Sequence, residues 1–139
     1  MSDIDATSPD SYRFWAEEHV RFADLDMLGH VNNKAYATYF ETARTSYFFS
    51  RGLGDGPRIG MAIVRLELDY RKEILFPGTL QLGVRLAKLG RSSLTLSCAI
   101  FNEDVCRATS MATLVRFNPQ ERKSQTFTDA ERTLLEADL

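Results

Sequence analysis

The sequence lacks the features that mark membrane, secreted, zinc-binding and nucleic-acid-binding proteins. No apolar run approaches the ~18–20 residues that span a bilayer, and the acidic, polar residues 1–11 carry neither the basic nor the apolar region of a secretory signal. Two cysteines and two histidines without close grouping provide no zinc ligand set. The formal net charge of −2 gives no support to nucleic-acid binding, for which a basic domain is typical. We therefore expect a cytoplasmic protein with no metal, no nucleic-acid partner and no membrane association.

Length and composition predict one folded unit. The chain has 139 residues, of which 44% are hydrophobic and 26% charged, an ordinary balance for a globular domain. Residues 1–11 have no periodicity, so we predict a disordered N-terminal tail there and a single domain over residues 12–139. Cys98 and Cys106 lie in segments of apolar pattern, and we interpret them as small buried thiols of a reducing compartment.

One stretch carries a long helical pattern. Apolar side chains recur along one helix face from Ala35 to Tyr47. No Gly or Pro interrupts the chain between Asn33 and Arg51, and Gly52 is a natural stop. The pattern predicts one long helix, and its many aromatic side chains need a broad partner surface such as a sheet.

Strands are predicted on both sides of this helix, over residues 12–22, 63–72, 80–86, 94–100 and 105–117. In the segment 63–72, strict alternation places Val64, Leu66, Leu68 and Tyr70 on one face. Short turns between successive strands predict an antiparallel meander with one buried and one polar face. A short C-terminal helix is expected with Thr128 as its N-cap. The fold class is therefore α+β, with one helix against four or five antiparallel strands.

The segment F-A-D-L-D-M-L-G-H-V-N-N-K-A-Y-A-T-Y-F-E-T-A-R, residues 22–44, carries the candidate chemistry. Asp24 and Asp26 precede a helix N-terminus expected near Asn32 or Asn33, where unpaired N–H groups can hold a developing oxyanion. A carboxylate beside that terminus can activate water or attack an acyl carbon. Spacing alone leaves the simpler alternative open, in which these aspartates cap the helix or lie solvated in a loop.

The same segment resembles the signature D-x-D-x-x-G-H-V-N-N-x-x-Y-x-x-Y-x-E-x-A-R of hotdog-fold acyl-CoA thioesterases of the 4-hydroxybenzoyl-CoA thioesterase type. The downstream segments V-R-L-E-L-D-Y-R-K-E-I-L-F-P-G-T-L and K-L-G-R-S-S-L-T-L resemble that family too, and only residues 1–11 fall outside the resemblance. The implied fold is a long central helix wrapped by a five-stranded antiparallel sheet, followed by a short C-terminal helix. The implied activity is hydrolysis of an acyl-CoA to a carboxylic acid and CoA.

The resemblance also implies roles for individual residues. Asp26 matches the catalytic carboxylate, acting as nucleophile or general base, and the backbone N–H of Asn33 matches the group that polarises the thioester carbonyl. The motif positions expected to shape the loop are Gly29, His30 and Asn32. The side chains expected to line an acyl pocket are Tyr36, Tyr39 and Phe40, with residues near 61–64 of either subunit. The residues expected to bind CoA phosphates at a hairpin are Lys88, Arg91 and Ser92.

Glu41 is the reserve candidate for the catalytic carboxylate, because another hotdog branch carries it on the central helix. Glu41 and Arg44 are spaced i, i+3, a spacing at which they can simply pair on the helix surface. No cofactor is expected, since coenzyme A is part of the substrate. A homodimer or homotetramer is expected, with active sites at the dimer interface, because a single curved sheet leaves edges and an apolar layer uncovered.

Two other functions stay open at this point. One is a hotdog (3R)-hydroxyacyl dehydratase or hydratase, in which His30 and Glu41 would form the acid–base pair. The sequence lacks the H-F-P…P-G pattern of the carrier-linked dehydratases and the D-x-N-P-x-H spacing of the hydratases. The other is a non-catalytic acyl-binding protein, against which the presence of Asp26 argues. The acyl group itself, aryl or fatty, is left undecided, because apolar pockets discriminate weakly between similar tails.

Overall fold

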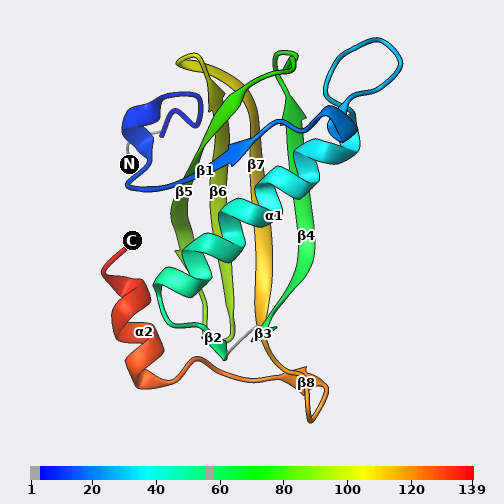
Figure 1. Ribbon diagram of the computed structural model, residues 1–139. Helices are drawn as coiled ribbons and strands as arrows, with labels where there is room; N and C mark the ends of the chain where they lie inside the picture. Colours follow the sequence, from blue (N-terminus) through cyan, green and yellow to red (C-terminus); the bar gives the residue numbers. More distant parts are fainter. Residues whose placement is uncertain (1–3, 56–57) are drawn as a thin grey trace.

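In the computed structural model, which describes residues 4–55 and 58–139, a curled antiparallel sheet packs against one long helix (Figure 1). The elements in chain order are the 3-10 helix η1 (Pro9–Ser11), β1 (Phe14–His19), the 3-10 helix η2 (Phe22–Asp24), α1 (Asn33–Ser50), β2 (Gly54–Asp55), β3 (Arg58–Ile59), β4 (Met61–Tyr70), β5 (Thr79–Leu89), β6 (Ser93–Asn102), β7 (Val105–Asn118), β8 (Lys123–Ser124) and α2 (Asp129–Glu136). The α+β prediction is confirmed. Neither α-helix in the described part of the chain is long and apolar enough to cross a membrane.

Helix α1 begins and ends where the sequence predicts. Asn32 is its N-cap, and the side-chain oxygen of Asn32 accepts a hydrogen bond from the N–H of Lys34 at 2.9 Å. After Arg51 the chain turns away at Gly52, whose φ of 70° favours glycine. The predicted start of α2 is also confirmed, because Thr128 accepts from the N–H of Glu131 at 3.1 Å.

The strand order is β1-β5-β6-β7-β4, with β8 paired to β7. Strands β5, β6 and β7 form the expected meander, but the prediction that β4 continues it next to β5 is wrong. Strand β1 occupies that side of β5, from the pair Phe14–Val84 to the pair His19–Thr79, and β4 pairs with β7 instead. The connection of residues 71–78 therefore crosses the end of the sheet. Alternation of apolar and polar residues indicates which face of a strand is buried, but it does not indicate which other strand pairs with it.

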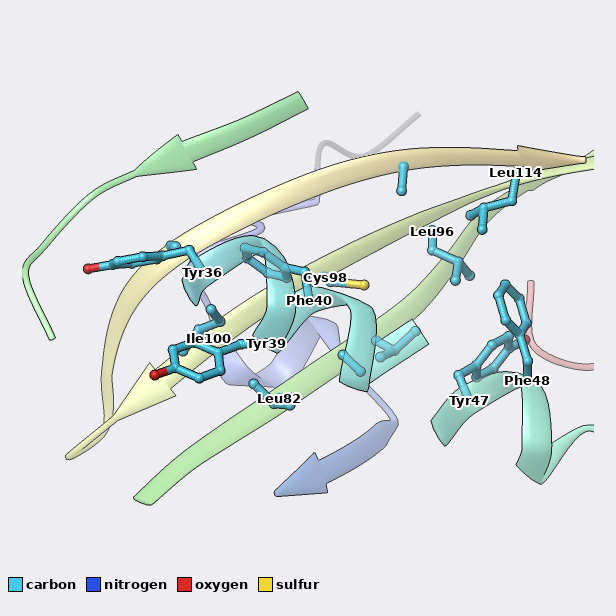
Figure 2. Packing of buried hydrophobic residues seen from close by; sticks show 14 of the residues in the cluster. Tyr36, Tyr39, Phe40, Tyr47, Phe48, Leu82, Leu96, Cys98, Ile100 and Leu114 are labelled. Atoms are coloured by element: carbon cyan, nitrogen blue, oxygen red, sulfur yellow. The ribbon is translucent and has the colours of Figure 1, made fainter. Parts of the chain in front are cut away.

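The core lies between the aromatic face of α1 and the concave face of the sheet. Figure 2 shows Tyr39 and Phe40 of the helix over Leu82, Cys98 and Ile100 of the strands. The predicted apolar face of β5 and β6 is confirmed by the buried side chains Leu80, Leu82, Val84, Leu86, Leu94, Leu96, Cys98 and Ile100. The prediction that the opposite face is polar and open is wrong for β6, because Ser97, Ala99 and Phe101 are buried there, the last two against Tyr12. Both cysteines are free thiols; Cys98 is buried and Cys106 is half-buried. Burial raises the pKa of Cys98 to about 12, so its thiol is protonated at neutral pH.

Strand β4 departs from the expected half-buried pattern. Val64 and Tyr70 are 63% and 52% exposed, and Leu66 is exposed as well. Leu66 and Tyr70 pair with Ala112 and Ala108 of β7, whose side chains are buried, so they lie on the helix side of the sheet. Helix α1 packs mainly over β1, β5 and β6; on β4 it contacts the ring of Tyr70 through Tyr36 and leaves Leu66 exposed.

Residues 5–11 form an ordered turn in place of the expected mobile tail. Ser11 Oγ donates to the carbonyl of Asp5 at 2.6 Å, and the phenol of Tyr12 donates to the carbonyl of Ala6 at 2.6 Å. Residues 1–3, also part of that predicted tail, lie outside the described residues. Periodicity missed this segment because side-chain and turn hydrogen bonds to the backbone, with no repeating apolar face, hold it.

Candidate active site

The two aspartates lie in a tight hairpin that leads directly into α1. The carbonyl of Asp24 accepts from the N–H of Asn32 at 2.7 Å, and the N–H of Asp26 donates to the carbonyl of His30 at 2.8 Å. Gly29 sits at the tip with a φ of 82°, a conformation that favours glycine. The predicted loop residues Gly29, His30 and Asn32 are thus brought together with Asp26.

The Asp26 carboxylate organises this hairpin and faces solvent. Oδ1 of Asp26 accepts from the N–H of Leu28 at 2.9 Å and from the N–H of His30 at 3.3 Å. Within residues 4–55 and 58–139, no hydrogen bond to Oδ2 is found. One carboxylate oxygen of Asp26 therefore has the structural role in the loop that the simpler alternative predicted. The other oxygen is open to water or a ligand.

Asn33 is the first residue of α1, which places its N–H at the positive end of an 18-residue helix. An N–H in the first turn has no partner within its helix, so it can donate to a ligand. The neighbouring Asn32 side chain satisfies the N–H of Lys34 instead. The helix terminus thus offers a hydrogen-bond donor at the end of the hairpin that carries Asp26.

Asp24 has a different role, which sequence reasoning did not assign. Asp24 is buried, and its carboxylate accepts from the phenol of Tyr39 at 2.6 Å and from the N–H of Arg21 at 2.9 Å. Burial acts to raise the pKa of Asp24, but the hydrogen bonds from Tyr39 and Arg21 outweigh it and hold the pKa below its usual value. The sequence did hint at this contact, because a tyrosine on a buried helix face needs a polar partner for its hydroxyl.

Two further residues reach the site from the end of β4 and the connection after it. Oε2 of Glu73 lies 3.0 Å from Nε2 of His30. The phenol of Tyr70 donates to the carbonyl of Asn33 at 3.3 Å, and its ring packs edge-on against Tyr36 at a centroid distance of 5.0 Å. These contacts join segments about forty residues apart, so local sequence patterns carry no signal for them.

The three predicted pocket residues have unequal positions. Tyr39 and Phe40 are fully buried against the sheet (Figure 2), so in the single chain they are core residues. Tyr36 is also buried, but its phenol donates to the carbonyl of Lys72 at 3.3 Å, at the end of the helix where Asn33 lies. Burial is the main cause of the raised pKa of Tyr36. Tyr36 is the best placed of the three to border a substrate.

The predicted CoA hairpin lies at the other end of the sheet (Figure 1). Strand β5 starts at Thr79, paired with His19 near the Asp26 loop, and runs 11 residues to Leu89. At about 3.3 Å per residue, this separates the two ends by about 33 Å. The residues of the hairpin are Lys88, Arg91 and Ser92. A cavity of about 390 Å³ beside Arg91 is also lined by Arg132 of α2, a cation that sequence reasoning missed.

The reserve carboxylate is poorly placed. Glu41 is exposed and lies eight residues into α1 from Asn33, about 12 Å along the axis. The suggested ion pair with Arg44 is not formed, because Arg44 is buried and Glu41 is exposed. Burial also lowers the pKa of Arg44.

Comparison with known proteins finds similarity to the thioesterase-like superfamily and to structures named as thioesterases. The sequence model of the Thioesterase-like superfamily matches residues 20–133. The uncharacterized protein YsmA of Bacillus subtilis (strain 168) is 31% identical over 127 residues, which cover 90% of this chain and 86% of the relative. A predicted thioesterase from Bacillus stearothermophilus superposes with a TM-score of 0.82 at 26% identity, covering 91% of this chain and 96% of that one. A thioesterase from Thermus thermophilus, complexed with coenzyme A and Zn, gives a TM-score of 0.80 at 31% identity, covering 89% and 98%.

Proposed function

The chain belongs to the thioesterase-like superfamily and has its hotdog fold, and on that premise we propose that it hydrolyses acyl-CoA thioesters to a carboxylic acid and CoA. The observation that carries this proposal is the N–H of Asn33 at the start of α1, at the end of the hairpin that holds Asp26. The coenzyme A bound by the similar Thermus thermophilus thioesterase supports CoA as the thiol part of the substrate. The likeness to the 4-hydroxybenzoyl-CoA type stays a prediction.

In the proposed reaction, the thioester carbonyl oxygen accepts a hydrogen bond from the N–H of Asn33. As negative charge develops on that oxygen, the helix terminus stabilises it without reorganisation. Asp26 uses its open oxygen, Oδ2, to take a proton from the attacking water or to attack the acyl carbon itself. The carbon–sulfur bond then breaks and CoA leaves as the thiol.

A second copy of the chain is the proposed partner, docked along the edge of β4. In the described part of the chain β4 pairs only with β7, and its apolar side chains Val64, Leu66 and Tyr70 are exposed; the Tyr70 phenol donates to the carbonyl of Asn33. If two β4 edges pair antiparallel about a two-fold axis, the sheet of the second copy points in the opposite direction. The hairpin of a second copy, with Lys88 and Arg91, would then lie at the same end as the Asp26 loop, three to four strand spacings or about 15–20 Å away. A monomeric mass at micromolar concentration would contradict this arrangement.

The dehydratase alternative gains nothing from the geometry. His30 is paired with Glu73, whereas Glu41 is exposed farther along α1. A dehydratase would hydrate crotonyl-CoA, with loss of the enoyl absorbance and no thiol release. An acyl-binding protein would give neither signal.

The test is a panel of aromatic, short, medium and long acyl-CoAs incubated with the wild-type protein and a thiol reagent. We expect release of free CoA from at least one class, and the preferred class identifies the acyl group. If no member of the panel releases thiol, the proposed hydrolysis is wrong. Hydration of crotonyl-CoA in the same preparation would then favour the dehydratase.

A further inference from the structure

Glu73 lies in the connection between β4 and β5, and the structure fixes this connection against the Asp26 hairpin. The N–H of Val31 donates to the carbonyl of Ile74 at 2.9 Å, and the guanidinium of Arg107 donates to the carbonyl of Glu73 at 3.2 Å. Ile74 is fully buried. The backbone that carries the Glu73 side chain is therefore held on both sides.

The Glu73 carboxylate meets the ring of His30. Oε2 of Glu73 and Nε2 of His30 are 3.0 Å apart, and a β-bridge between His30 and Leu75 keeps the two segments in register. The backbone of His30 is joined to Asp26 in turn, since its N–H donates to Oδ1 at 3.3 Å and its carbonyl accepts the Asp26 N–H at 2.8 Å. The side chains of His30 and Glu73 are 43% and 54% exposed, so a bound substrate can reach the imidazole.

This contact decides which ring nitrogen can meet a substrate. With Nε2 directed at Glu73, Nδ1 is the nitrogen left for a ligand, and a carboxylate in this position holds both the orientation and the tautomer of an imidazole. When the ring is protonated, Nε2–H donates to Glu73 and Nδ1–H is available as an acid.

We propose that Glu73 is a positioning residue that holds His30 so that Nδ1–H protonates the sulfur of the departing thiol. This inference rests on the proposed hydrolysis and adds the step at the leaving group. It gives Glu73 and His30 a role separate from that of Asp26, which acts at the acyl carbon.

The step balances without any further reactant. In the general-base form, the oxygen of water bonds to the acyl carbon while Asp26 takes one proton. The carbon–sulfur bond breaks with its electron pair on sulfur, and sulfur receives the proton of His30 Nδ1. His30 recovers a proton from Asp26 through solvent. One water is consumed, and one carboxylic acid and one thiol are released.

A purely structural role for the Glu73–His30 contact, as a link between two loops, predicts a different result. A loosened loop displaces Asp26 and slows every thioester alike. Loss of an acid at the leaving group slows only thioesters of a poorly leaving thiol, because an aryl thiolate of low pKa departs without protonation. The leaving group is therefore the variable that separates the two roles.

The experiment compares one acyl group carried on CoA and on an activated aryl thiol, with Glu73→Gln, Glu73→Asp and His30→Asn. On the CoA thioester, we expect kcat to fall about tenfold for Glu73→Gln and about 100-fold for His30→Asn, with KM nearly unchanged. On the aryl thioester, both should keep the wild-type kcat within about twofold. Glu73→Asp keeps the charge and should recover part of the loss, whereas Asp26→Asn should slow both substrates.

Glu17→Gln is the matched control, since Glu17 lies 3.7 Å from the chain's other histidine, His19, on β1. It should leave both rates unchanged. Equal losses on both substrates, or full kcat of Glu73→Gln on the CoA thioester, would overturn the role of Glu73 while hydrolysis stands. Wild-type protein that cleaves neither substrate would overturn the hydrolysis itself, and this inference with it.

Discussion

Asp24 and Asp26 are two residues apart in one hairpin and lie in opposite surroundings. Asp24 is buried, and its carboxylate accepts hydrogen bonds from the phenol of Tyr39 and the N–H of Arg21. Asp26 is exposed, and one of its carboxylate oxygens accepts hydrogen bonds from two N–H groups of its own loop. Asp24 attaches the hairpin to α1, and the hairpin in turn holds Asp26 at the surface.

In the proposed reaction, rigidity and reactivity are divided between these two neighbouring carboxylates. A catalytic group must be held within a fraction of an ångström by a supporting shell, yet it needs an oxygen free for the reaction. Asp24 supplies the support, because a buried carboxylate with two hydrogen-bond donors is costly to displace. Asp26 can then remain open.

The largest expected effect comes from Asp26→Asn. The amide can still accept from the loop N–H groups, so the hairpin is kept, but it can act neither as base nor as nucleophile. We expect kcat on the preferred acyl-CoA to fall by about 10²–10⁴-fold, with an unfolding free energy close to wild type. Steady-state thiol release and urea denaturation measure the two quantities. Unchanged hydrolysis would show that Asp26 is not the catalytic carboxylate.

Tyr39→Phe tests the supporting half of the comparison. It leaves the buried Asp24 carboxylate without one donor, and we expect a loss of about 1–3 kcal/mol in unfolding free energy, together with a moderate loss of kcat. Tyr47→Phe is the matched control, since the Tyr47 phenol donates to the Asp138 carboxylate at 2.6 Å, away from the hairpin. It should lower stability alone. Equal kcat in the two variants would show that the hydrogen bond between Tyr39 and Asp24 does not support the active site.

Gly29→Ala strains the hairpin tip without removing a polar group. The added methyl group meets no atom within 4 Å, so its cost is the backbone conformation at φ 82°, about 1–2 kcal/mol. Gly52→Ala, at φ 70° and with equally open surroundings, carries the same cost at the far end of α1. We expect similar thermal shifts in both variants and a lower kcat in Gly29→Ala only. A normal kcat there would mean that the hairpin geometry is not critical.

The sequence predicted the elements of this site better than their assembly. The helix start near Asn32 or Asn33 and the stop at Gly52 follow from local chemistry, and the structure has both. The pairing of β4 with β7 and the contact of Glu73 with His30 depend on chain segments far apart, for which periodicity carries no information. The pattern of β4 indicated an apolar face, but the extent of α1 decided that this face stays largely exposed in the single chain.

The smallest expected effect is the contribution of Asp24 to stability at acid pH. Its pKa in the folded protein lies below the ordinary value of 3.8, because the hydrogen bonds from Tyr39 and Arg21 outweigh burial. The folded state therefore binds the proton less readily than the unfolded state, and the stabilisation is fully present above about pH 4 and lost as the pH falls through the folded pKa. Urea denaturation between about pH 5 and pH 2 should show the wild type losing more stability than Asp24→Asn, which has no carboxylate to protonate. Parallel pH profiles would mean that Asp24 is not held as the anion, and the division between the two aspartates would then rest on burial alone.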